Sequence, residues 1–109
     1  MFGNKDSQDK GGTHLESVIG AESSFQGTLR SKGSIRIDGK VEGGITAEGV
    51  ILGERGEVQG DISARTVVVG GKVTGNIHAT ESLELLTKSQ VFGDLHAPQL
   101  LIAEGAIFE

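Results

Sequence analysis

The residues with the clearest potential for chemistry are two histidines, His78 and His96, which occupy the same position in two copies of a short repeat. If successive copies stack as neighbouring strands, the two imidazoles lie about 5 Å apart. A pair of this kind could share a metal ion or act as a base. No third ligand or carboxylate recurs at this repeat position, and the sequence has no cysteine. The pattern by itself therefore assigns neither a catalytic nor a metal site.

The histidines belong to a seven-residue repeat in which apolar and polar positions alternate around a glycine. Alternation with a period of two is the pattern of a β-strand with one buried face. A sixth, partial copy begins at Ile107. The five full copies are Phe25–Ser31, Val41–Ala47, Val58–Ala64, Val73–Ala79 and Val91–Ala97.

A short apolar segment follows each copy, and all variation in repeat length lies in the two connections beside it. One connection has two or three residues and the other has three to five. Length changes confined to glycine-rich polar stretches are typical of surface corners, so each repeat is predicted to form one coil of a solenoid. The segments are Ile35–Ile37, Val50–Leu52, Val67–Val69, Leu83–Leu85 and Leu100–Ile102.

We predict an all-β fold, a right-handed parallel β-helix of about five to six coils with a triangular hydrophobic core, over residues 15–109. Residues 1–14 are polar and lack periodicity, so they are predicted to form a disordered tail. The glycine of each copy marks a bend with a positive φ or with no room for a side chain. The repeat predicts an inward ladder of Phe25, Val41, Val58, Val73, Val91 and Ile107.

The composition excludes several other classes. The chain has 109 residues, 18 glycines and a formal net charge of −5. No stretch has the i, i+3, i+4 spacing of an amphipathic helix over three turns, which argues against a helical bundle. The negative charge disfavours nucleic acid as a partner, and the sequence has no GxxxxGK[ST] motif for a nucleotide. It also has no apolar run long enough to span a membrane.

The C-terminal stretch is predicted to associate with another copy of the chain. An open solenoid end exposes unpaired backbone groups around an apolar cross-section, and the stretch from Leu100 to Glu109 contains no helix or proline to cover it. Phe92 and Phe108 fall on an outward line that is polar in the earlier copies. The candidate contact residues are Leu100, Ile102, Ile107, Phe108 and Phe92 at this end, and Ile19 and Phe25 at the other.

The V-x-G-x-[IL] repeat, the acidic cysteine-free composition and the tail opening with Met1-Phe2 make the sequence resemble the bactofilins, a bacterial polymer-forming cytoskeletal family. The resemblance covers residues 15–109. It implies assembly without nucleotide into non-polar filaments, in which like ends meet, on the inner face of the cytoplasmic membrane. Membrane targeting would fall on Met1 and Phe2, with Lys5 nearby. It also implies scaffolding of cell-shape or cell-wall proteins.

Two alternatives remain. One is an enzyme resembling the left-handed β-helical acyltransferases, with a histidine as base, but those chains keep a strict six-residue repeat and add a helix or loop that forms a pocket. The other is a monomeric β-helix that binds ice or polysaccharide, which would need a regular Thr-x-Thr array. Neither pattern is present, so we expect a structural protein that is not an enzyme and uses no cofactor.

Overall fold

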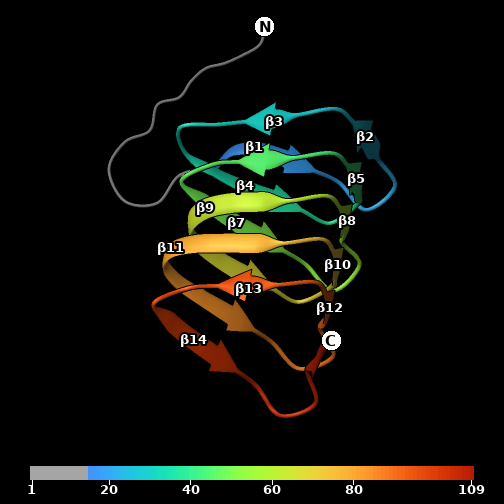
Figure 1. Ribbon diagram of the computed structural model, residues 1–109. Coiled ribbons are helices and arrows are strands. Elements are labelled where there is room, and N and C mark those ends of the chain that lie inside the picture. Colours follow the sequence, from blue (N-terminus) through green and yellow to red (C-terminus); the bar gives the residue numbers. More distant parts are fainter. Residues whose placement is uncertain (1–14) are drawn as a thin grey trace, which may run out of the picture.

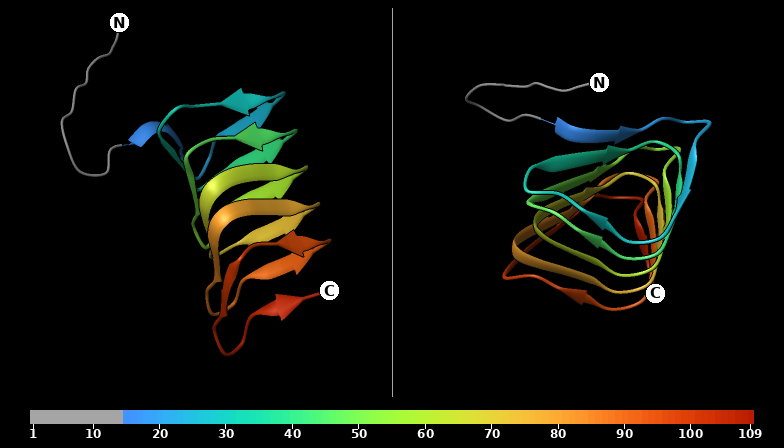
Figure 2. Two further views of the ribbon diagram at one scale, coloured as in Figure 1. Left: turned by 60° about the vertical axis from the view of Figure 1, so that its left-hand side comes forward. Right: turned by 90° about the horizontal axis from the view of Figure 1, so that it is seen from above.

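The computed structural model describes residues 15–109, with side chains from Ile19 onward. This part of the chain consists of strands and turns without a helix, wound into a right-handed solenoid of about 5 turns (Figure 1). Seen along its axis, the solenoid has a triangular outline (Figure 2). The predicted fold class, a right-handed parallel β-helix, is therefore confirmed.

Each turn of the solenoid passes through three faces, and all the strand pairings between turns are parallel. A 9-stranded sheet bends over two of the faces, and a 6-stranded sheet forms the third. The longest strands, β9 and β11, run continuously around the bend of the larger sheet. The strands are β1 (Leu15–Ile19), β2 (Ser24–Gln26), β3 (Leu29–Arg30), β4 (Ser34–Ile37), β5 (Lys40–Glu42), β6 (Ile45–Thr46), β7 (Gly49–Leu52), β8 (Glu57–Gln59), β9 (Ile62–Val69), β10 (Lys72–Thr74), β11 (Ile77–Leu85), β12 (Gln90–Phe92), β13 (Leu95–His96), β14 (Gln99–Ile102) and β15 (Ile107–Phe108).

Equivalent residues of successive turns pair with one another, so each inward side chain rests on the one before it. Val58, for example, pairs with Val41 in the preceding turn and with Val73 in the next. β-Branched side chains pack well in such ladders, and their burial is complete in the middle of the rod. The buried apolar core comprises Ile35, Ile37, Val41, Ile45, Val50, Leu52, Val58, Ile62, Ala64, Val67, Val69, Val73, Ile77, Ala79, Leu83, Leu85 and Val91.

The glycine of each repeat makes the bend between the smaller sheet and the larger one. Gly60 has a φ of 147°, and a Cβ on it would collide with the carbonyl oxygen of Gly43 in the preceding turn. Its amide donates a hydrogen bond of 2.9 Å to the carbonyl of Thr74 in the next turn. The bend therefore needs a residue without a side chain, as predicted. The same positive φ occurs at Gly27, Gly43, Gly60, Gly75 and Gly93.

The corners that lead into the smaller sheet contain either three or five residues. In the five-residue corner 53–57, the amide of Gly56 donates to the carbonyl of Gly53 at 2.9 Å. Corner 86–90 repeats this turn, with 3.1 Å between the Ser89 amide and the Leu86 carbonyl. Corner 103–107 closes in the same way, through the Ala106 amide and the Ala103 carbonyl at 3.2 Å. The last corner thus ends at residue 107.

This corner corrects the predicted register of the final turn. The ladder assignment placed Ile107 inward below Val91 and Phe108 outward beside Phe92, but Val91 pairs with Phe108 and Gln90 pairs with Ile107. The sequence interpretation gave the last corner four residues, whereas the turn hydrogen bond requires five. Phe108 therefore continues the inward ladder, and Ile107 follows Lys72 and Gln90 on an outward line of the same sheet.

The bend geometry predicts different effects of alanine at two neighbouring glycines. Gly60→Ala should lower the free energy of unfolding by about 2–4 kcal/mol, because it combines an unfavourable φ with a backbone collision. Gly44→Ala is the control, since the nearest heavy atom to its Cβ would be the Asp61 carbonyl oxygen at 3.9 Å. Its effect should stay within about 0.5 kcal/mol. Equal losses in denaturant unfolding followed by circular dichroism would contradict the assignment.

Candidate polymerisation interface

The C-terminal end of the rod is a complete turn whose outer edge pairs with no other strand among residues 15–109. Strand β13 ends one path of the larger sheet, β14 pairs only with β11, and β15 ends the smaller sheet. Within the described residues, the backbone groups on the far side of these three strands therefore have no strand partner. An edge of this kind is a template for further strand pairing.

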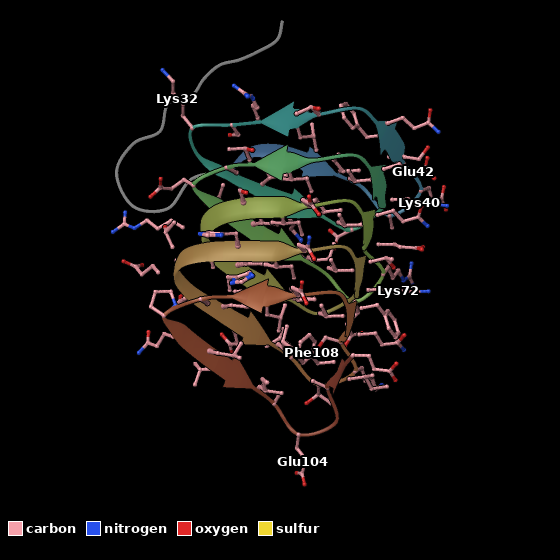
Figure 3. The ribbon with its side chains drawn as sticks, viewed as in Figure 1. Lys32, Lys40, Glu42, Lys72, Glu104 and Phe108 are labelled. Atoms are coloured by element: carbon pink, nitrogen blue, oxygen red, sulfur yellow. The ribbon has the colours of Figure 1, made fainter. Side chains whose placement is uncertain are left out.

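Inward side chains of this last turn are half exposed, although their partners one turn earlier are fully buried. Leu100 pairs with Leu83 and Ile102 pairs with Leu85. The exposed fractions are 44% for Leu100, 52% for Ile102 and 46% for Phe108, against 0–1% for Leu83, Leu85 and Val91. Figure 3 places Phe108 at this end of the rod and Glu104 at the outer tip of the last corner. Among the described residues, none covers the hydrophobic core at the C-terminal end.

Apolar side chains also face outward on the last two turns. Leu101 is 60% exposed, and Ile107 and Leu86 are exposed as well. Phe92 pairs with Thr74 on the outer line, as the sequence indicated. It is half-buried, and the ammonium of Lys72 lies 5.8 Å from the centre of its ring. The outward assignment of Phe92 is therefore confirmed, whereas that of Phe108 is wrong.

The N-terminal end differs from the C-terminal end in exposure. Ile19 pairs with Ile37 and Phe25 pairs with Val41, so both extend the inward ladders to the first turn. Both are only half-buried, yet neither is among the large apolar side chains that stand exposed in the described structure, all of which belong to residues 86–108. Among the side chains that the structure describes, from Ile19 onward, the C-terminal end is therefore the more apolar of the two. Met1, Phe2 and Lys5 lie outside the described residues.

The corner between the two faces of the larger sheet carries charged side chains that bridge successive turns. Arg65 lies 2.8 Å from a carboxylate oxygen of Glu48 in the preceding turn and 3.2 Å from one of Glu81 in the next. The hydrogen bond to Glu48 and the charge of Glu81 raise the pKa of the Arg65 guanidinium. On the smaller sheet, Lys40 and Glu42 form another ion pair, with 3.7 Å between nitrogen and oxygen (Figure 3).

The charged groups around Arg65 line a hollow on the surface. A shallow hollow of about 550 Å³ lies over this corner, between Lys32, Glu48, Arg65 and Glu81, and both carboxylates are already paired with Arg65. His78 and His96 pair in register on β11 and β13, outside this hollow. Within residues 15–109, no group of three or more histidine, cysteine or carboxylate side chains is arranged to hold a metal ion. No helix long and apolar enough to cross a membrane occurs among the described residues.

The fold and the open end together define a class: a parallel β-solenoid with an edge suited to self-association. The family model for bactofilins, described as polymer-forming cytoskeletal, matches residues 17–109. The chain is also 39% identical over 93 residues to bactofilin BacO of Myxococcus xanthus (strain DK1622), an alignment covering 84% of this chain and 74% of that protein. The chain belongs to the bactofilin family.

One further relative and two solved structures of bactofilins are also similar to this chain. Bactofilin BacP of the same organism is 35% identical over 92 residues, which cover 84% of this chain but only 38% of BacP. A crystal structure of a point mutant of the Thermus thermophilus bactofilin has a TM-score of 0.74 at 32% identity, covering 80% of this chain and 98% of that one. A cryo-EM reconstruction of double helical filaments of the Thermus thermophilus bactofilin shares the fold, with a TM-score of 0.52 at 22% identity.

Proposed function

We propose that this chain is a cytoskeletal protein that assembles end to end, without nucleotide, into non-polar filaments that lie on the inner face of the cytoplasmic membrane. The observation that supports this most directly is the uncovered C-terminal turn, which exposes the ends of the core ladders and three unpaired strand edges. Membership of a family described as polymer-forming and cytoskeletal points the same way.

Burial of the open end supplies a driving force for the end-to-end contact between two subunits, which we call the joint. Leu100, Ile102 and Phe108 are each about half exposed, so covering one of them contributes roughly 1 kcal/mol. Three such side chains from each of two subunits contribute roughly 6 kcal/mol, which is near the lower estimates for the entropic cost of association. Strand pairing across the joint adds to this apolar term. Neither contribution requires nucleotide hydrolysis.

The difference between the two ends favours contacts between like ends. A joint between two C-terminal ends covers Leu100, Ile102 and Phe108 of both subunits, whereas a head-to-tail joint sets them against the less apolar N-terminal end. An isologous joint of this kind is closed, so growth needs a second joint between N-terminal ends, where Ile19 and Phe25 lie. Alternation of the two joints produces a filament without polarity.

Membrane attachment is assigned to the N-terminal tail. Met1 and Phe2 are two large apolar side chains, and Lys5 is nearby. Two such side chains contribute roughly 2–4 kcal/mol on insertion, which is too little for one molecule. A filament presents many tails to one bilayer, and their high effective concentration makes the attachment strong. A filament held in this way can serve as a scaffold for cell-shape or cell-wall proteins.

The joint can be tested with a charge at the end of the core. Phe108→Asp should convert filaments into small soluble species, because each C-terminal joint would then bury unpaired carboxylates. Gln59→Asp is the matched control, since Gln59 is exposed on the outside of the same sheet in the middle of the rod. The measurement is the pelleted fraction in ultracentrifugation, with circular dichroism to confirm folding. Undiminished pelleting of Phe108→Asp would overturn the C-terminal joint.

The tail can be tested independently of the joint. Deletion of residues 1–10 should abolish co-sedimentation with liposomes while leaving filament formation unchanged. Phe2→Ser in the full-length chain should weaken liposome binding in the same direction, because one of the two apolar side chains is lost. If the shortened chain still binds liposomes as well as the full chain, the membrane contact lies on the rod and the assignment to the tail is wrong.

A further inference from the structure

Two imidazoles stack on the outside of the rod close to its C-terminal end. Strands β11 and β13 lie side by side (Figure 1), and their parallel pairing sets His78 directly opposite His96. The ring centroids are 5.9 Å apart and the ring planes differ by 26°. Both side chains are exposed. The same line continues to Ser63 and Thr46 in the two preceding turns, so only these two turns present imidazoles there.

The ring nitrogens are available for coordination. Among residues 15–109, no side-chain hydrogen bond or ion pair involves either ring. A metal–imidazole bond is about 2.0–2.1 Å long, so both rings must tilt toward a common ion from their present separation. Both side chains are exposed, so rotation about their own bonds can make this tilt. The strand pairing keeps the two backbones in register while they do so.

We propose that His78 and His96 form a two-nitrogen site for a divalent transition-metal ion of the kind that imidazole prefers, such as Cu²⁺, Ni²⁺ or Zn²⁺. Solvent completes the coordination shell, because the described part of the chain supplies no third ligand. The register between β11 and β13 confirms the adjacency that the repeat pattern predicted.

The site has a structural consequence for the end of the rod. Strand β13 has 2 residues, and it is the last strand of its sheet path. An ion held by His96 on β13 and His78 on β11 would tie this short edge strand to the turn before it. Metal binding would therefore stabilise the terminal turn that carries the proposed joint.

Equilibrium dialysis of the full-length chain against Ni²⁺ tests the proposal. The variants are His78→Thr and His96→Thr, which introduce the residue found at position 46 on the same line, together with the double variant. Each single variant should bind Ni²⁺ about tenfold more weakly or worse than the wild-type chain, because the second imidazole binds the ion intramolecularly. The double variant should be little weaker than either single variant.

Further outcomes distinguish a site shared by His78 and His96 from independent binding by each histidine and from binding at His14. His14→Thr should bind Ni²⁺ as the wild-type chain does. If each single variant keeps the wild-type affinity at half the stoichiometry, the histidines act independently and the proposal is wrong. A loss of binding in His14→Thr alone would place the ion on the tail and would overturn the proposal equally.

Thermal unfolding supplies a second readout that does not depend on dialysis. Excess Ni²⁺ should raise the melting temperature of the wild-type chain, because the ion binds the folded pair more tightly than the unfolded chain. The same excess should leave the melting temperature of His96→Thr unchanged, and without Ni²⁺ the two proteins should melt together. Equal shifts in both proteins would contradict a site shared by the two strands.

Discussion

The structure depends on the stacking of equivalent residues in register from one turn to the next. Each inward side chain is buried by the same position of the turns on either side, as Val58 is by Val41 and Val73. In such a core each turn contacts only the turns next to it. An inward side chain is therefore fully buried only where its turn has neighbours on both sides. The terminal turn has a neighbour on one side alone, and Leu100, Ile102 and Phe108 consequently remain half exposed. The tendency to associate follows from the same interaction that forms the fold.

Two features keep this register while the sequence varies. The glycine bends bring backbones of successive turns so close that no Cβ fits, as at Gly60 against Gly43. The corners absorb differences in length as either three or five residues, and the long ones close with the same turn hydrogen bond. Charged side chains such as Arg65, which bridges Glu48 and Glu81, lie on the exposed corners and add little to stability. The inward ladders therefore stabilise the fold far more than the charged surface side chains do.

The repeat predicted the fold because period-two alternation and glycine spacing are local features of the sequence. The ladders through Val41, Val58 and Val73, the positive φ of the glycines and the outward position of Phe92 were all predictable in this way. The inward position of Phe108 was not predictable in this way, because the final copy is partial. Its alignment depends on the length of the corner before it. The five-residue corners at 53–57 and 86–90 contained the signal that would have corrected it. The adjacency of His78 and His96 was also predictable from their shared repeat position, whereas the unequal exposure of the two ends is a tertiary property that no single repeat encodes.

Assembly is proposed to follow from burial of the exposed solenoid ends, above all the C-terminal turn, without nucleotide. Electron microscopy of the purified full-length chain, at high concentration in plain buffer without nucleotide or lipid, tests this most directly. Long unbranched filaments should form spontaneously. Discrete particles of uniform size under these conditions, with the terminal turn covered by the protein's own chain, would contradict the proposal.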